Sequence, residues 1–236
     1  MKKIGLFFGT FDPIHNGHIK VAQNFLINNK QVSEVWFVVT PNSPFKQHNK
    51  ISSKEARLEM VKVATDSFNN LVPSDFEFRF SSPQYTSNTL RVLKKKYKSK
   101  YDFIIIMGID NYNSLLMDGW KDSLFILNNF QIAVHKRYLN QHSALSSLDS
   151  LMPSKTSIVK SSSNLIEIDS DLIPVSSTEI RKLINLTWEK SGFMDLDGED
   201  VLGFVKTENS LEALLKHLDQ GVLTFILKNN LYRRIK

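Results

Sequence analysis

The stretch "IGLFFGTFDPIHNGHIKVAQNFL", residues 4–26, decides the fold. It opens with a short apolar run, residues 4–8, which is typical of a buried strand. Apolar residues then recur at helical spacing, which predicts a helix beginning near Gly17 and His18. A polar turn lies between the two segments, and in it His15 and His18 flank an Asn-Gly pair. The stretch therefore predicts a strand, a turn bearing two histidines, and a helix, in that order.

The rest of the chain continues the alternation of strand and helix patterns. Several of the runs are apolar on both faces, which is typical of a parallel sheet covered by helices on two sides. We therefore expect an α/β fold with a doubly wound parallel sheet. Further strands are predicted at residues 34–39, 76–80, 102–107, 130–134 and 165–168. Further helices are predicted at residues 53–64, 86–97 and 176–184.

The last part of the chain is predicted to be helical beyond Asn185. Residues 210–221 place leucines on one face, and Gly221 is expected to stop that helix. Residues 222–232 are expected to follow as a short terminal helix. The fold class is therefore α/β with a helical C-terminal part.

Two structural units are expected from this division. The first is an α/β domain of residues 1–186, and the second is a helical extension of residues 187–236 packed on the same domain. The extension includes an atypical insertion around residues 187–220. Within the first unit, the Ser-rich residues 143–163 lack apolar periodicity and are expected to form a surface loop.

Composition excludes several classes of protein. Hydrophobic residues make up 42% of the 236 residues and charged residues 23%, which fits a soluble globular protein. The chain contains no cysteine, so disulfides, thiolate catalysis and Cys-ligated zinc are excluded. No apolar run approaches the roughly 20 residues that cross a bilayer, and the first run is too short for a signal peptide. We expect a cytoplasmic protein with no membrane partner.

The formal net charge of +6 suits a substrate that carries phosphate. The same charge would also suit weak contact with nucleic acid. However, no zinc finger, RNA-binding strand motif or long basic region accompanies it. We therefore expect no nucleic-acid partner, and we expect the run Lys94-Lys95-Lys96 to form a solvated helix face.

His15 and His18 are the first candidates for chemistry. Helical zinc pairs use histidines four residues apart with an intervening Glu, and that pattern is absent here. A helix start offers unpaired backbone N–H groups and the positive end of the helix dipole, so two imidazoles there favour an anion site. Gly9 would let the backbone approach a ligand closely. The alternative is that His15 only caps the helix and His18 lies on the surface.

A second helix start, in "SSTEIRKLI", predicts another anion site. Ser176, Ser177 or Thr178 would cap the helix, with Glu179 in its first turn. Arg181 lies about one turn in, so its side chain can reach back over the helix start. A guanidinium presents a planar fork of donors suited to phosphate. The alternative is an ordinary capped helix with an exposed arginine.

The polar segments that follow the predicted strands are expected to meet. In open α/β sheets, ligands bind outside the carboxyl ends of the strands. "GTFDPIHNGH", "TPNSPFK", "MGID" and "PVSSTEIR" all lie at such ends. We therefore expect the four segments to converge on one site.

These motifs resemble those of a known superfamily. "GTFDPIHNGH" and "SSTEIR" match the two signatures of the nucleotidylyltransferases, which have a Rossmann-like fold. The finer details are similar to bacterial nicotinate-nucleotide adenylyltransferase and occur in that family's order over nearly the whole chain. They are "FGTFDPIHNGH", "TPNSPFK", "QYTSNTL", "MGIDNYNSLLMDGW", "PVSSTEIRKLI" and "FILKNNLY".

The resemblance implies a reaction and a set of site residues. The 5′-phosphate of nicotinate mononucleotide would attack the α-phosphate of ATP, giving deamido-NAD and pyrophosphate, by positioning and charge stabilisation. Mg²⁺ would enter with ATP, and no metal site of the protein's own is implied. The implied catalytic residues are His15, His18 and Arg181. The implied ATP-binding residues are Gly9, Thr10, Phe11, Gly108, Asp110, Ser177 and Thr178. The implied mononucleotide-binding residues are Asn42, Lys46, Tyr85, Thr86 and Trp120.

Two of these residues also have plain structural explanations. Thr86, or its neighbour Ser87, could simply cap the helix of "TSNTLRVLKKKY". Trp120, which matches an aromatic residue that stacks on the pyridine ring, could simply pack in the core.

Two departures from the family and three alternative functions stay open. Lys136 and Arg137 stand where the family usually has an Arg-Pro-Gly-like turn, and the link after Asn185 is longer than usual. The alternatives are use of the amidated mononucleotide, action on pantetheine phosphate, and a non-catalytic nucleotide sensor. Pantetheine enzymes lack "YTSNTL" with a downstream "GW", and a sensor would be expected to lose a signature residue. The sequence also leaves a homo-oligomer open.

Overall fold

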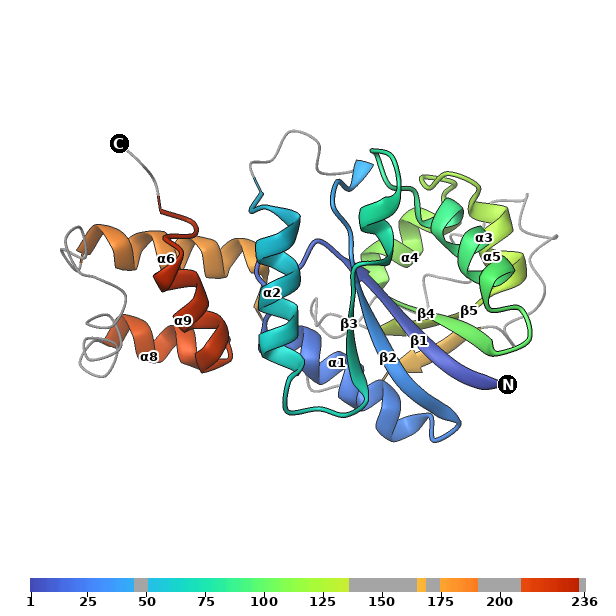
Figure 1. Ribbon diagram of the computed structural model, residues 1–236, viewed down its shortest axis with the longest axis horizontal. Helices are drawn as coiled ribbons and strands as arrows, with labels where there is room; N and C mark the ends of the chain where they lie inside the picture. Colours follow the sequence, from blue (N-terminus) through green and yellow to red (C-terminus); the bar gives the residue numbers. More distant parts are fainter. Residues whose placement is uncertain (45–50, 136–164, 169–174, 191–208, 234–236) are drawn as a thin grey trace, which may run out of the picture.

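A six-stranded, all-parallel sheet forms the centre of the fold (Figure 1). The structure is a computed structural model and describes residues 1–44, 51–135, 165–168, 175–190 and 209–233. The strand order is β3-β2-β1-β4-β5-β6. The strands are β1 (Lys2–Gly9), β2 (Val32–Val39), β3 (Leu71–Ser74), β4 (Tyr101–Gly108), β5 (Gln131–His135) and β6 (Leu165–Ile168). The doubly wound sheet predicted from the sequence is confirmed.

Helices alternate with the strands and then close the chain. Within the described ranges, six lie between or directly after strands: α1 (Asn16–Asn28), α2 (Lys54–Thr65), the 3₁₀ helix η2 (Phe76–Arg79), α3 (Thr86–Lys96), α4 (Ile109–Leu116) and α5 (Ser123–Asn129). Three follow the last described strand: α6 (Ser177–Lys190), α8 (Asn209–Leu215) and α9 (Gln220–Lys228). The predicted boundary between residues 186 and 187 falls inside α6, and the division into two units stays a prediction.

The sheet is buried on both faces because its strands are apolar at consecutive positions. Successive side chains of a strand point to opposite faces, so Phe7 of β1 joins one core while Ile4 and Leu6 join the other. The core around Phe7 includes apolar residues of α1, α2, α6, α8 and α9. The other core includes apolar residues of α3, α4 and α5. Each large apolar side chain buried in this way contributes about 1.5–3 kcal/mol.

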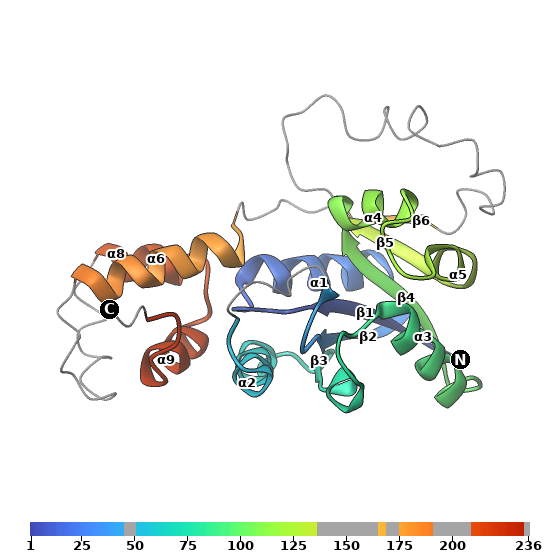
Figure 2. The same cartoon turned by 90° about the horizontal axis from the view of Figure 1, so that it is seen from above.

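The C-terminal helices lie at one end of the molecule. Figures 1 and 2 both show α6, α8 and α9 beside the ends of α1 and α2, away from α3 and α5. The strand β1 runs from the N-terminus toward this end, so its carboxyl end faces α2 and α6 (Figure 1). The strand order reverses between β1 and β4, which is the point where ligands bind in doubly wound sheets.

Two local expectations are wrong. Residues 76–80 are not a strand: Phe76 and Glu77 are consecutive and both buried, in the helix η2, whereas a half-buried strand would alternate. The strand that pairs with β2 is β3, just before them. Gly221 does not stop a helix but is the second residue of α9. A Cβ there would lie 2.7 Å from Val63 Cγ1, so glycine allows α9 to pack against α2.

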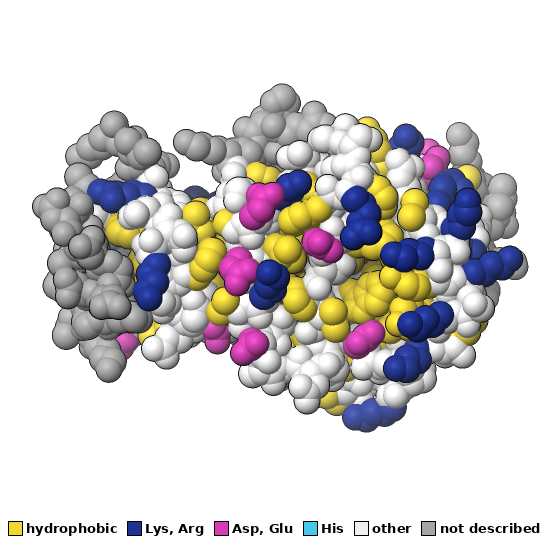
Figure 3. Space-filling model, viewed as in Figure 1, with side chains coloured by type: hydrophobic (Ala, Val, Ile, Leu, Met, Phe, Trp, Pro, Cys, Tyr) yellow, Lys and Arg dark blue, Asp and Glu magenta, His cyan; other side chains and the backbone are white. Residues whose placement is uncertain are grey.

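The expectation of a solvated basic face on the third helix is confirmed. Lys94, Lys95 and Lys96 are exposed in the last turn of α3, where positive charge interacts favourably with the helix dipole. In Figure 3, lysine and arginine side chains gather on the side of the molecule where α3 lies. No helix among the described residues has the length and apolar character to span a bilayer. Lys46, Lys136, Arg137 and the Ser-rich residues 143–163 lie outside the described part of the chain.

Candidate active site

The segment between β1 and α1, residues 9–15, is called the signature loop below. Phe11 has a backbone φ of 48°, and its buried ring packs against Phe37 at 5.4 Å and His18 at 5.2 Å between centroids. A Cβ at Gly9 would lie 2.7 Å from the Phe11 ring. The missing side chain at Gly9 therefore makes room for Phe11, and only the backbone of Phe11 is left to face a ligand.

His15 and His18 come together at the start of α1, as the sequence predicts. His15 is the N-cap residue and His18 is the third helical residue, and their ring centroids are 3.7 Å apart. The His15 backbone N–H donates to His18 Nδ1 at 3.2 Å. Because Nδ1 accepts, a neutral His18 ring carries its proton on Nε2, where it is a donor. His15 is 6% exposed, whereas His18 is half-buried, with its ring against Phe7 and Phe11.

The start of α6 forms a capping box. The Ser176 backbone N–H and hydroxyl donate to Glu179 Oε2 at 2.8 and 2.7 Å, and the Glu179 N–H donates to Ser176 Oγ at 3.2 Å. Of the three candidate caps, Ser176 therefore takes the role. Ser177 is left to donate its hydroxyl to the Pro13 carbonyl at 2.9 Å, which ties α6 to the signature loop.

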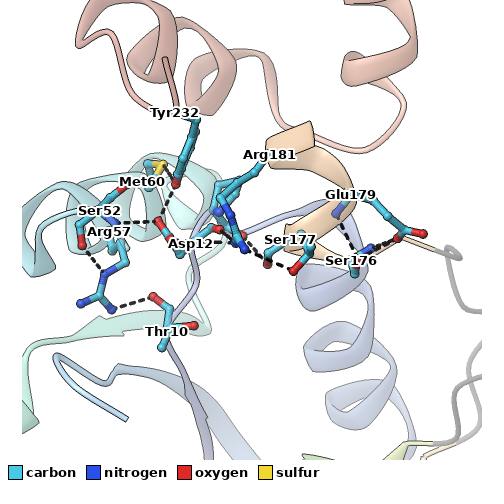
Figure 4. Close-up of polar contacts among 12 residues, drawn as sticks. Thr10, Asp12, Ser52, Arg57, Met60, Ser176, Ser177, Glu179, Arg181 and Tyr232 are labelled. Atoms are coloured by element: carbon cyan, nitrogen blue, oxygen red, sulfur yellow. Dashed lines mark hydrogen bonds and ion pairs between the residues drawn. The ribbon is translucent and has the colours of Figure 1, made fainter. Parts of the chain in front are cut away.

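Arg181 reaches back over the start of α6, as its position predicts (Figure 4). Its Nη1 donates to the Asp12 carbonyl at 2.6 Å, and its Nη2 donates to Thr178 Oγ1 at 3.2 Å. Nη1 is also 3.9 Å from Asp12 Oδ2. The two predicted anion sites are thus joined at one loop, although 169 residues separate Asp12 from Arg181.

A buried arginine that the sequence analysis missed holds the signature loop from its other side. Arg57, on α2, is 1% exposed. Its guanidinium donates to the carbonyls of Thr10 at 2.8 Å, Thr40 at 2.7 Å, Pro41 at 2.8 Å and Ser52 at 3.0 Å. Burial lowers the pKa of Arg57 from its ordinary value, and the charge of Asp12 opposes that shift. One side chain therefore joins the segments after β1 and β2 and before α2.

The predicted mononucleotide residues that the structure describes lie around the start of α3. The Asn42 N–H donates to Gln84 Oε1 at 2.9 Å, and the Gln84 N–H donates back to the Asn42 carbonyl at 3.2 Å. Tyr85 is the N-cap residue of α3 and its side chain makes no capping hydrogen bond. The expectation that Thr86 or Ser87 caps this helix is therefore wrong, since both lie inside it.

The segment that carries Trp120 contacts the same helix start. Lys121 Nζ lies 4.6 Å from the centroid of the Tyr85 ring. Trp120 is half-buried, and its carbonyl accepts from the Ser123 hydroxyl at 2.6 Å. The structure thus brings together Asn42, Tyr85, Thr86 and the segment of Trp120.

A buried carboxylate lies beneath this group. Glu77 accepts from the Thr89 hydroxyl at 2.6 Å and is 1% exposed. Burial raises the pKa of Glu77, and hydrogen bonds from Thr89 and Thr40 oppose the rise. Nothing in the alternating pattern of residues 76–80 distinguished this glutamate from a solvent-facing one.

Gly108 and Asp110 lie at the carboxyl end of β4, next to β1 in the sheet. Gly108 is the N-cap residue of α4, and Asp110 is exposed in the first turn of that helix. A Cβ at Gly108 would lie 3.3 Å from His135 Nε2. The glycine therefore leaves room for the His135 side chain of the neighbouring strand β5. Within the described ranges, no group of three or more His, Asp or Glu residues could hold a metal ion.

Comparison with known proteins agrees with this architecture. Residues 6–183 match the model of the cytidylyltransferase-like family. A relative in Flavobacterium psychrophilum, named probable nicotinate-nucleotide adenylyltransferase, is 47% identical over 135 residues, 57% of this chain and 68% of the relative. A relative of the same name in Christiangramia forsetii is 42% identical over 136 residues, 58% of this chain and 68% of the relative.

A solved structure shares the fold. It is the nicotinic acid mononucleotide adenylyltransferase of Plasmodium falciparum complexed with NaAD, with a TM-score of 0.69, 19% identity and 98% coverage of both chains. The strand order, the joined helix starts of α1 and α6, and the matching residues 6–183 lead to one conclusion. The chain belongs to the cytidylyltransferase-like family.

Proposed function

We propose that this protein is a nicotinate-nucleotide adenylyltransferase that transfers AMP from ATP to nicotinate mononucleotide. An oxygen of the mononucleotide 5′-phosphate forms a bond to the α-phosphorus of ATP. The bond from that phosphorus to the oxygen bridging to the β-phosphate breaks, and pyrophosphate leaves. The relatives from Flavobacterium and Christiangramia carry the name of this activity.

One observation carries the proposal: α6 is tied to the signature loop beside His15 and His18. Ser177 donates to the Pro13 carbonyl and Arg181 to the Asp12 carbonyl, so two helix starts lie against a single turn. The reaction brings several phosphate groups together, and each helix start favours negative charge. A turn flanked by two such starts suits ATP and a second phosphate at once.

The assigned roles follow from the donors present. We assign His18 Nε2–H and the N–H groups of Arg181 that do not face protein carbonyls to the negative charge that develops at the α-phosphate and the leaving pyrophosphate. His15, packed against His18, is assigned to the same phosphates. Gly9, Thr10, Phe11, Gly108, Asp110, Ser177 and Thr178 are assigned to ATP, the first three through their backbone.

The start of α3 is assigned to the nicotinate end of the mononucleotide. Its N–H groups and dipole favour a carboxylate, which is the observation that favours the acid over the amide substrate. Asn42, Tyr85, Thr86 and Trp120 lie around this helix start, and Lys46 is assigned with them from the sequence. Charge-assisted hydrogen bonds contribute about 1.5–3 kcal/mol each, so we expect at least a tenfold preference for the acid.

Mg²⁺ is proposed to enter as the Mg–ATP complex. The nearest carboxylate of the signature loop, Asp12, is 2% exposed and lies beside Arg181, which disfavours a cation there. A cytoplasmic location fits an enzyme that consumes ATP and a free mononucleotide, and an oligomer stays a prediction.

Pyrophosphate release tests the proposal directly. Purified protein is assayed with Mg–ATP and with nicotinate mononucleotide, nicotinamide mononucleotide or pantetheine phosphate in separate reactions. We expect turnover with the first and at least tenfold lower kcat/KM with the second. Equal kcat/KM values would contradict the role of α3, and turnover with pantetheine phosphate alone would overturn the assignment. ATP binding without turnover on any acceptor would indicate a nucleotide sensor.

A further inference from the structure

The side chain of Asp12, in the signature loop, has an uneven environment. Its Oδ1 accepts from the Tyr232 hydroxyl at 2.7 Å and from the Ser52 backbone N–H at 3.3 Å. Its Oδ2 is buried and has no hydrogen-bond partner among the described residues. Arg181 Nη1 lies 3.9 Å from that oxygen, which is too far for a hydrogen bond. The carboxylate therefore forms a long ion pair with Arg181 but no hydrogen bond.

This arrangement sets up a competition for Arg181. A buried carboxylate oxygen without a partner attracts a guanidinium strongly, and a bidentate pair is the preferred geometry. If the Asp12 side chain were free to rotate, it could take Arg181 in such a pair and draw donors away from a bound phosphate. The two hydrogen bonds on Oδ1 fix the rotation of the carboxylate and partly satisfy its negative charge. Arg181 then rests on the neutral carbonyl of Asp12 instead.

Tyr232 has an unusual backbone conformation and a buried hydroxyl. Its φ of 63° lies in the left-handed region, which is uncommon for a residue with a bulky side chain and costs about 1–3 kcal/mol. The hydroxyl also lies 4.0 Å from Met60 Sδ (Figure 4). Burial raises the pKa of Tyr232 above its ordinary value, and the charge of Asp12 raises it further, so the hydroxyl keeps its proton at neutral pH.

We propose that Tyr232 is a positioning residue for adenylyl transfer: its hydroxyl restrains the Asp12 carboxylate so that Arg181 stays available to the phosphates of ATP. The inference rests on the proposed function for the identity of the reaction, but its contact network does not depend on which mononucleotide is used. Tyr232 comes from the segment after α9, so the C-terminal helices contribute to the site as well as to the core.

The test is Tyr232→Phe, which removes one oxygen and keeps the ring. We expect kcat/KM for ATP to fall about tenfold, the effect of one charge-assisted hydrogen bond. KM for the mononucleotide should stay within about twofold of wild type, because α3 is not part of this network. The matched control is Asp219→Ala, which removes the side-chain cap of α9 without touching Asp12. It should lower the melting temperature but leave kcat/KM for ATP unchanged.

The variant Asp12→Asn distinguishes two roles of Tyr232: positioning the Asp12 carboxylate, or only anchoring the C-terminal segment. In Asp12→Asn, the amide oxygen can still accept from Tyr232, but the charge that competes for Arg181 is gone. Adding Tyr232→Phe to this variant should change kcat/KM for ATP by less than about twofold. The same tenfold loss in both backgrounds would show that Tyr232 only anchors the C-terminal segment. A wild-type value for Tyr232→Phe alone would also overturn the proposal.

Calorimetric titration with Mg–ATP tests the role of Tyr232 without requiring turnover, so the inference and the proposed function can fail separately. Should wild-type protein turn over neither mononucleotide, the assigned reaction fails. The affinity for Mg–ATP then serves as the readout for wild type, Tyr232→Phe, Asp12→Asn and the double variant. Tyr232→Phe should weaken binding about tenfold in the wild-type background and less than about twofold in the Asp12→Asn background. Equal affinities of wild type and Tyr232→Phe would reject the inference by itself.

Discussion

The two sides of the candidate site are built in different ways. The phosphate side, formed by the signature loop and α6, is held by two guanidinium groups, Arg57 and Arg181, that donate to backbone carbonyls. The mononucleotide side, at the start of α3, is held by the paired hydrogen bonds between Asn42 and Gln84 and by single charged groups, Lys121 over the Tyr85 ring and the buried Glu77.

The difference follows from what each side is proposed to bind. A site that binds several phosphates is stabilised by cations among the residues that hold its backbone in place. A site that binds an aromatic ring and one carboxylate does not need such cations. Removing a charged side chain from a buried hydrogen-bond network costs much free energy, because its partners are left unsatisfied. We therefore expect substitutions on the phosphate side to have larger effects than those on the mononucleotide side.

The largest effect is expected for Arg57→Met. The variant leaves four carbonyls from three segments without their donor, and we expect the free energy of unfolding to fall by about 3–5 kcal/mol. Urea denaturation followed by circular dichroism measures it. Arg79→Met is the control, since Arg79 is exposed and makes only surface contacts, a 4.0 Å ion pair with Asp75 and a contact with the Phe76 ring. It should change stability by less than about 0.5 kcal/mol. Similar losses for the two variants would refute the role given to Arg57.

His18→Ala is expected to lower kcat by roughly 10²–10³ by removing one donor to the charge that develops in the transition state. Melting temperature should change little, because His18 is only half-buried. Asn28→Ala, at the exposed far end of α1, is the control and should keep wild-type kcat. If His18→Ala also kept near-normal kcat in a pyrophosphate-release assay, the histidines would be structural only.

Arg181→Lys keeps the charge but loses the planar fork. We expect kcat/KM for ATP to fall roughly 10- to 100-fold, because an ammonium cannot hold two oxygens as a guanidinium does. Steady-state kinetics with varied ATP at saturating mononucleotide shows whether turnover or affinity carries the loss. Lys182→Ala removes a neighbouring exposed charge and should have less than a twofold effect. An unchanged kcat/KM in Arg181→Lys would contradict the proposed anion site at the start of α6.

The smallest effect is expected on the mononucleotide side, for Glu77→Gln. Because burial raises the folded-state pKa of Glu77 above 4.5, the folded state binds more protons than the unfolded state above that pH. The free energy of unfolding of wild type should therefore fall as the pH rises from 4.5 through the raised pKa of Glu77. Glu77→Gln has no titratable group at this position and should not show this fall. The difference should stay within the roughly 1 kcal/mol of a typical substitution.

Urea titrations at several pH values compare this variant with Glu59→Gln, an exposed glutamate paired with Lys62. The control should follow wild type across the range. Parallel stability curves for wild type and Glu77→Gln would mean that the burial of Glu77 does not perturb its ionisation.

The parts of the site that the sequence predicted are those with local causes. The strand, turn and helix of residues 4–26 follow from apolar spacing, and the reach of Arg181 over the start of α6 follows from its position one turn inside a capped helix. Both depend on residues a few positions apart. Periodicity and capping rules describe such distances well.

Arg57, Glu77 and Tyr232 could not be found in the same way. Arg57 lies in an ordinary amphipathic pattern, and Glu77 lies between two phenylalanines that read as a strand. Tyr232 contacts a residue 220 positions away. In each case the side chain is buried by a tertiary contact, and the spacing of the neighbouring residues in the sequence does not indicate that contact. Gly221 was misread for the same reason, since its role is to admit α2.

The contact between Asp12 and Tyr232 also has a consequence for how the protein is made on the ribosome. Asp12 is translated 220 residues before Tyr232. At about 5–20 residues per second, the signature loop waits roughly 10 to 45 s for this partner. During that interval the nascent chain can assemble its parallel sheet, because β6 ends at Ile168. The site is therefore expected to mature after the sheet, as a late step of co-translational folding.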